Sequence, residues 1–131
     1  MKRIIMCLIL TAVILPAAAA HARDYLKDAY EQTITPAKIV FAYDECVKQG
    51  YLENDGPTAE ARFRHAIDKV RTSKDPSRPK DVTGEQVAAA EFKAVDMIKA
   101  GLAKKPVPLN QAECNAIQKE WPALSEQFGL Q

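Results

Sequence analysis

The sequence predicts an all-α fold: a small bundle of four to five helices, clipped by one disulfide, after a cleaved N-terminal signal peptide. Apolar residues recur at intervals of three and four along most of the chain, the period of a helix with one buried face. No segment shows the sustained alternation and β-branched enrichment typical of a half-buried strand. Two cysteines, Cys46 and Cys114, remain after removal of the leader.

The N-terminus has the three parts of a secretory signal. Lys2 and Arg3 precede an uncharged apolar run over 4–15, and small residues follow. The letters AHA at 20–22 match the small-x-small cleavage pattern, so we place the cut between Ala22 and Arg23, with a cut two residues earlier as the alternative. The apolar run is shorter than the ~20 residues that span a bilayer, although an uncleaved anchor stays open as an alternative.

We therefore expect a periplasmic or secreted bacterial protein, with residues 1–22 as signal peptide and residues 23–131 as a single helical domain. Cleavage leaves 109 of the 131 residues, enough for one modest core. The basic count falls from 18 to 16 against 17 acidic residues, a net charge of −1. A nearly neutral chain has no overall attraction for nucleic acid or anionic lipid, so we expect neither partner, nor stable membrane insertion after cleavage.

The cysteine pair predicts a disulfide. Cys7 lies in the apolar run and leaves with the signal, whereas Cys46 and Cys114 remain in a chain that has left the reducing cytosol. A metal site usually needs about four ligands in close Cys and His pairs. The mature chain has one histidine, His65, and no CxxC motif. We predict a Cys46–Cys114 bond, with two free buried thiols as the alternative, and expect no metal and no cofactor.

The first half of the domain predicts two helices. A short helix is expected over 24–32. Thr35 as N-cap and Pro36 at the first helical position then predict the start of another helix, which Gly50 ends. Its inward face consists of residues at helical spacing: Ile39, Tyr43, Cys46 and Val47. Cys46 is therefore expected to point inward from the middle of that helix.

A turn-forming stretch over 53–58 separates this helix from the next. The helix that follows the turn has an apolar face made of Ala59, Phe63, Ala66, Ile67 and Val70. The predicted helix ends at about Thr72, and a polar loop over 72–81 that contains two prolines follows it. We expect this loop to be exposed and to suit a contact with a partner.

Two further helices complete the chain. Thr83 and Gln86 form a capping box, and the helix that it opens is expected to run to about Gly101. Asn110 is the expected cap of the last helix. Within that helix Pro122 should cause a kink or a split.

The order of charges along the chain is uneven. The net charge is −4 from Asp44 to Glu60 and +5 from Arg62 to Lys80. The second stretch contains seven candidate partner-binding residues, called here the basic set: Arg62, Arg64, Lys69, Arg71, Lys74, Arg78 and Lys80. One interpretation is a solvated helix face, partly paired as in Arg64 with Asp68. The other is a surface for an acidic protein or wall polymer.

Catalytic motifs are not found in the sequence. GxSxG, HExxH and glycine-rich phosphate loops do not occur. His65 is interpreted as a surface or boundary residue, and spacing singles out no pair among the 17 carboxyl side chains. We expect no catalytic residues and no enzymatic activity, with a small exported carboxylate-based hydrolase as the alternative.

In size, export signal and cysteine count, the chain is similar to small helical periplasmic proteins. These include the amidase immunity proteins of type VI secretion and the acid-stress periplasmic chaperones. No residue motif is matched, so the resemblance implies no functional residues. We expect a non-catalytic protein-binding module, for instance an inhibitor or immunity protein against a secreted or periplasmic enzyme. A periplasmic stress or acid chaperone, or an assembly factor, is the alternative.

Overall fold

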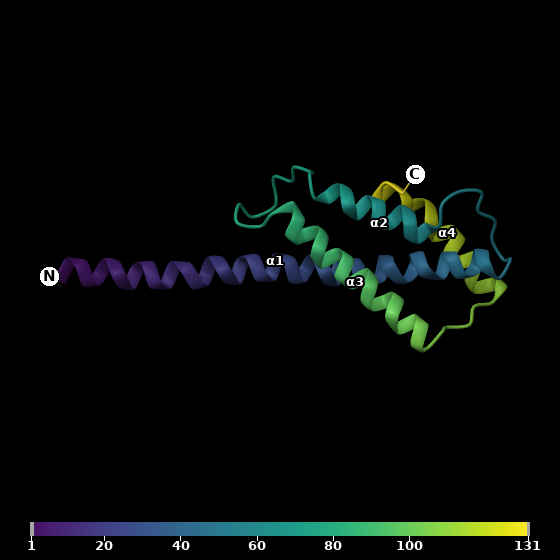
Figure 1. Ribbon diagram of the computed structural model, residues 1–131, viewed down its shortest axis with the longest axis horizontal. Helices are drawn as coiled ribbons and strands as arrows, with labels where there is room; N and C mark the ends of the chain where they lie inside the picture. Colours follow the sequence, from purple (N-terminus) through teal and green to yellow (C-terminus); the bar gives the residue numbers. More distant parts are fainter. Residues whose placement is uncertain (1, 131) are drawn as a thin grey trace.

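The computed structural model describes the backbone of residues 2–130 and the side chains of residues 20–130. Within this part the protein is all helical, as predicted. Four helices follow one another along the chain: α1 (Lys2–Lys48), α2 (Ala59–Val70), α3 (Gly84–Lys104) and α4 (Gln111–Phe128) (Figure 1). The predicted signal peptide, with Cys7, falls mainly on side chains outside those described. It stays a prediction, as does the cut between Ala22 and Arg23.

α1 is the element on which the others assemble. α3 crosses it obliquely and makes its most extensive contact with it, α2 packs against both, and α4 packs against α1 (Figure 1). The main core joins all four helices and the residue after the last turn. Its buried members are Ala37, Val40, Ala59, Phe63, Ile67, Ala88, Val95, Leu124 and Leu130. Edge-to-face packing of Phe63 on Phe128, with ring centroids 5.3 Å apart, ties α2 to the end of α4.

The structure contradicts the predicted break between a helix over 24–32 and a second helix that starts at Thr35. α1 continues through Pro36 without interruption. A proline inside a helix lacks the N–H that would bond the carbonyl four residues earlier, which costs about 3 kcal/mol. Burial offsets that cost, because Ala37 and Val40 are fully buried in the core directly after the proline. At this position tertiary packing outweighs the local helix-start signals of Thr35 and Pro36.

The predicted N-caps of α3 and α4 are confirmed. The Thr83 hydroxyl accepts from the Gln86 N–H (3.2 Å), and the Gln86 side chain accepts from the Thr83 N–H (3.0 Å). The Asn110 side chain accepts from the Glu113 N–H at 2.8 Å. Gly50 follows α1 with φ of +84°, a conformation that glycine adopts readily. These local hydrogen bonds satisfy backbone groups that the helices leave free at their starts.

Other boundaries agree closely with the prediction. The stretches 53–58 and 72–81 connect helices without being helical themselves. α3 ends at Lys104, about one turn beyond the expected Gly101. α4 is one helix through Pro122, which excludes the split but not the kink among the two predicted outcomes. Pro122 is exposed, so the carbonyl that loses its helical partner can bond to water instead.

Cys46 and Cys114 form the predicted disulfide, with Cα atoms 5.8 Å apart. Both are fully buried and pack with Leu52 in a second, smaller core. The expected place of Cys46 in the middle of a helix is wrong, because it lies close to the end of α1. Cys114 lies in the first turn of α4, as expected. A stack of Tyr43 on Trp121, with centroids 4.2 Å apart, strengthens this junction.

The disulfide fits an oxidising compartment outside the cytosol. Among the described residues, no helix carries an apolar stretch of the length needed to cross a membrane.

Candidate functional site

The basic set is partly neutralised by the protein itself. Arg64 forms an ion pair with Glu60 (2.8 Å) and another with Asp96 of α3 (2.8 Å). Lys99 also contacts Glu60 at 2.9 Å. Burial disfavours the charge on Glu60, but the hydrogen bonds from Lys99 and Arg64 outweigh it and lower the pKa of Glu60. This network joins α2 to α3.

The predicted pair of Arg64 with Asp68 is therefore wrong. Asp68 instead pairs with Arg71 at 2.9 Å. The Arg71 guanidinium also lies over the Phe92 ring, 5.6 Å from its centroid, a cation–π contact between α2 and α3. Two of the seven basic residues are thus engaged in holding helices together.

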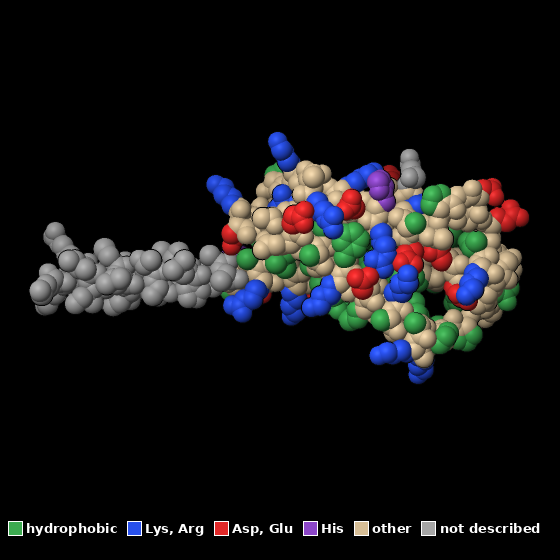
Figure 2. Space-filling model, viewed as in Figure 1, with side chains coloured by type: hydrophobic (Ala, Val, Ile, Leu, Met, Phe, Trp, Pro, Cys, Tyr) green, Lys and Arg blue, Asp and Glu red, His purple; other side chains and the backbone are tan. Residues whose placement is uncertain are grey.

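The rest of the basic set is spread out. Arg62 donates to Asn54 at 3.4 Å and Arg78 to the Ser73 carbonyl at 3.3 Å, while Lys69, Lys74 and Lys80 are exposed. Figure 2 shows Lys and Arg side chains scattered among acidic ones on this face rather than gathered in one patch. A basic docking surface stays a prediction, now with fewer free charges to support it.

The structure shows a cleft of about 670 Å³ that the sequence analysis did not predict. It opens where α1, the end of α2, the loop after it, the start of α3 and the end of α4 meet. We call it the Glu91 cleft. Its polar lining consists of Tyr25, Asp28, Gln32, Thr33, Ser73, Asp75, Ser77, Arg78, Glu91 and Gln127. In Figure 1 the loop and the start of α3 lie at the end of the helical body nearest the N-terminus.

Glu91 has an unusual environment within this cleft. It is more than half buried, and burial alone raises its pKa from the ordinary 4.5 to about 7. None of the described side chains or N–H groups donates a hydrogen bond to it or pairs with it. Desolvation without a compensating donor is what raises the pKa of a carboxyl group. Carboxyl groups perturbed in this way occur often at functional sites.

Asp75, on the loop side of the same cleft, shows the opposite behaviour. The Ser77 hydroxyl donates to its carboxylate at 2.7 Å, and the Ser77 N–H donates at 2.9 Å. Those bonds lower the pKa of Asp75, with smaller contributions from Arg78 and from a hydrogen bond of Tyr25. The cleft therefore holds one carboxylate that the protein stabilises and one that it does not.

The position of the cleft depends on a close approach at Gly84, the first residue of α3. A Cβ atom on Gly84 would lie 2.5 Å from the Arg71 carbonyl oxygen and 2.6 Å from that of Val70. Only glycine lets α3 start this close to the end of α2. The loop between the two helices begins and ends at this close approach, and it lines the cleft together with residues of α1.

The sequence did contain a signal for Glu91. The inward residues of α3 include Val87, Ala88, Ala94 and Val95, and Glu91 lies at helical spacing between them. A lone carboxyl group on an apolar stripe has to be paired, exposed at an edge or perturbed. In the structure Glu91 is partly exposed and its pKa is raised.

Among the described side chains, no three His, Cys, Asp or Glu residues gather closely enough to hold a metal ion. Comparisons with protein families, with characterised proteins and with solved structures find no match to this chain.

Proposed function

We propose that this chain is an exported, non-catalytic protein-binding module, of the class that includes inhibitors and immunity proteins, and that the Glu91 cleft receives part of its partner. The observation that carries the proposal is the Glu91 carboxyl, half buried in a cleft and without a hydrogen-bond donor among the described residues. An unpaired carboxylate in such a place lowers stability. It is therefore expected at a recognition site rather than in a purely structural position.

The openness of the cleft favours a protein over a small molecule. Pockets for small ligands usually bury roughly 70–90% of the ligand surface. Most polar residues around this cleft are exposed, among them Asp28, Gln32, Ser73, Ser77 and Gln127. A side chain of a larger partner can enter the cleft while the rest of the partner contacts the 72–81 loop and the α1 surface.

Export is the second part of the proposal. It is supported by the predicted signal peptide and by a disulfide that joins distant parts of the chain. An inhibitor or immunity protein in the periplasm needs a rigid body that survives outside the cytosol, and the bond supplies one.

The test is capture of the partner by the full chain with a C-terminal tag, expressed in its native cell and recovered from the exported fraction. Gln32→Trp fills the mouth of the cleft from an exposed position on α1. The matched control, Gln118→Trp, places the same side chain at an exposed position of α4 that does not line the cleft. Circular dichroism checks that both variants are folded.

We expect one stoichiometric partner with the unmodified chain and with Gln118→Trp, and its loss with Gln32→Trp. Equal capture by both variants would contradict the role of the cleft. A broad set of clients that grows at acidic pH would instead favour the chaperone alternative.

A second candidate, the carboxylate-based hydrolase, has one observation in its favour. Glu91 and Asp75 line the same cleft with pKa values shifted in opposite directions, a pattern shared by acid–base pairs in glycosidases. In this case Glu91 is the proton donor and ionised Asp75 the stabilising group. Turnover of a glycoside panel, abolished by both Glu91→Gln and Asp75→Asn, would support it over the binding module.

A further inference from the structure

We infer that the Glu91 cleft binds a basic side chain of the partner, a lysine ammonium or an arginine guanidinium, which donates hydrogen bonds to Glu91 and to hydroxyl oxygens around it. This inference rests on the proposed function and specifies the chemistry of its partner.

The first support is the direction of the hydrogen bonds inside the cleft. Three of the hydroxyls that line it already donate their protons within the chain: Thr33 to the Ala29 carbonyl (2.7 Å), Ser73 to the Val70 carbonyl (3.0 Å) and Ser77 to Asp75 (2.7 Å). A hydroxyl that has given its proton can only accept a further bond. Those groups therefore offer lone pairs to a ligand, and a ligand that fits them must bring donors.

The second support is the charge of the lining. Three carboxyl groups, those of Asp28, Asp75 and Glu91, line the cleft against one guanidinium, that of Arg78. Arg78 donates to the Ser73 carbonyl at 3.3 Å, and among the described side chains it makes no ion pair with Glu91. With all four groups ionised, the lining has a net charge of −2. A cation that carries N–H donors matches both the negative charge of the lining and the free lone pairs of its hydroxyl oxygens.

Binding of such a cation should depend on pH. Glu91 is the group that titrates near neutrality, since burial raises its pKa to about 7. The other charged or titratable groups that line the cleft with it are Tyr25 and Asp28 from α1 and Asp75 and Arg78 from the loop. α2 and α4 contribute only uncharged residues to the lining. A cation favours the ionised form of Glu91, so affinity should rise as pH increases through 7 and fall as Glu91 becomes protonated.

The test uses the protein purified from the exported fraction and three probes. The first is an N-acetylated, C-amidated tripeptide, Gly-Arg-Gly. The second is the same peptide with uncharged citrulline in place of arginine. The third is spermidine, a free polyamine. Binding is followed by the chemical shift of the Glu91 amide and by calorimetry at about pH 6 and about pH 8. The variants are Glu91→Gln and the matched control Glu120→Gln, an exposed carboxyl of α4 outside the cleft.

We expect the arginine peptide to bind at least ten times more tightly than the citrulline peptide, and more tightly at about pH 8 than at about pH 6. Glu91→Gln should weaken binding at least tenfold and abolish its pH dependence, while Glu120→Gln leaves both unchanged. Equal binding of the two peptides, or no effect of Glu91→Gln, would overturn the inference. Spermidine binding tighter than the arginine peptide would also overturn it, by assigning the cleft to free polyamines.

Failure here is distinguishable from failure of the proposed function. If Gln32→Trp loses the captured partner but Glu91→Gln keeps it, the binding module stands and the basic side chain is wrong. If Gln32→Trp keeps the partner, the cleft itself is not the recognition site.

Discussion

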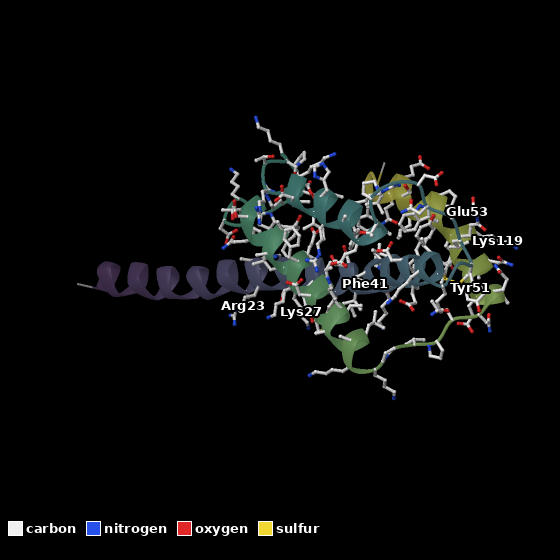
Figure 3. All side chains as sticks on the ribbon, turned by 45° about the vertical axis from the view of Figure 1, so that its right-hand side comes forward. Arg23, Lys27, Phe41, Tyr51, Glu53 and Lys119 are labelled. Atoms are coloured by element: carbon white, nitrogen blue, oxygen red, sulfur yellow. A yellow bond between two sulfur atoms is a disulfide. The ribbon has the colours of Figure 1, made fainter. Side chains whose placement is uncertain are left out.

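The two ends of the helical body differ in how closely their helices pack together. At the disulfide end, Cys46 and Cys114 are sealed in a small core between α1 and α4. At the other end, α1, the 72–81 loop and α3 surround an open cleft. Figure 3 shows the separation: Arg23 and Lys27 lie on α1 toward the cleft end, while Tyr51, Glu53 and Lys119 lie at the disulfide end.

Two carboxyl groups make the contrast specific. Asp44, near the disulfide end of α1, accepts from the N–H groups of Ala59 (2.7 Å) and Glu60 (2.8 Å) at the start of α2. Glu91 lies on the neighbouring helix, also partly buried, and accepts from no group of the described chain. The protein uses the first carboxylate to hold its own fold. We propose that the second is available to a partner outside the chain.

The largest expected effect is loss of the disulfide. The bond closes a loop with a sequence separation of 68 residues, so the chain-entropy model gives about 4 kcal/mol. Cys46→Ala should lower the free energy of unfolding of the oxidised protein by roughly that amount, as measured by denaturant titration. An unchanged midpoint with both the substitution and a reducing agent would mean that the bond does not stabilise the fold.

The next effect concerns the cleft end. Gly84→Ala places a methyl group 2.5 Å from a backbone oxygen, and backbone cannot move aside cheaply, so we expect a loss of about 2–3 kcal/mol. Gly101→Ala is the matched control in the same helix, since nothing lies within 4 Å of its Cβ position. It should stabilise α3 by about 0.5–1 kcal/mol. Equal effects of the two substitutions would show that α3 does not approach α2 this closely.

Asp44→Asn tests the carboxylate that the protein uses for itself. An amide oxygen can replace one of the two bonds to the start of α2 but not its charge, so we expect a loss of about 1–2 kcal/mol. Glu53→Gln, an exposed position at the same end, serves as the control and should change stability by less than about 0.5 kcal/mol. Thermal unfolding of both variants makes the comparison.

Glu91→Gln should stabilise the protein, whereas Asp44→Asn should destabilise it. Because the pKa of Glu91 is raised in the folded protein, its contribution to stability is full below pH 4.5 and is lost as pH rises through about 7. A shift of this size corresponds to about 3 kcal/mol, which we reduce to roughly 1–2 kcal/mol because water reaches part of the side chain. The variant should therefore be more stable than the parent at about pH 8 and nearly equal at about pH 4.5. Denaturant titrations at the two pH values measure this difference. A variant less stable than the parent at about pH 8 would contradict the prediction.

The contrast between the ends also explains what the sequence could predict. The disulfide, the caps at Thr83 and Asn110 and the stop at Gly50 are set by a few residues each, and they were predictable. The break at Thr35 was not a safe prediction, because a local start signal competes with burial of distant residues. Glu91 is the clearest case: its helix and its stripe could be inferred, but its lack of a partner depends on how the loop folds back.

The basic set is a second case in which contacts between helices decide what the sequence pattern left open. A run of positive charge in the sequence suggested one surface, but Arg64 pairs with acids on both α2 and α3 and Arg71 lies over an aromatic ring. Which charges remain free depends on helix contacts far apart in the chain. Spacing along one helix does not determine them.

The most direct measurement is an NMR titration of the Glu91 side-chain carboxyl in the protein purified from the exported fraction, with Glu120 as internal reference. We predict a pKa of about 7 for Glu91, because no donor among the described residues offsets its burial in the cleft. A pKa near the ordinary 4.5 would show that water or a partner within the chain already satisfies the carboxylate. In that case the cleft would have no unpaired acceptor to offer, and the proposed recognition of a basic side chain would lose its basis.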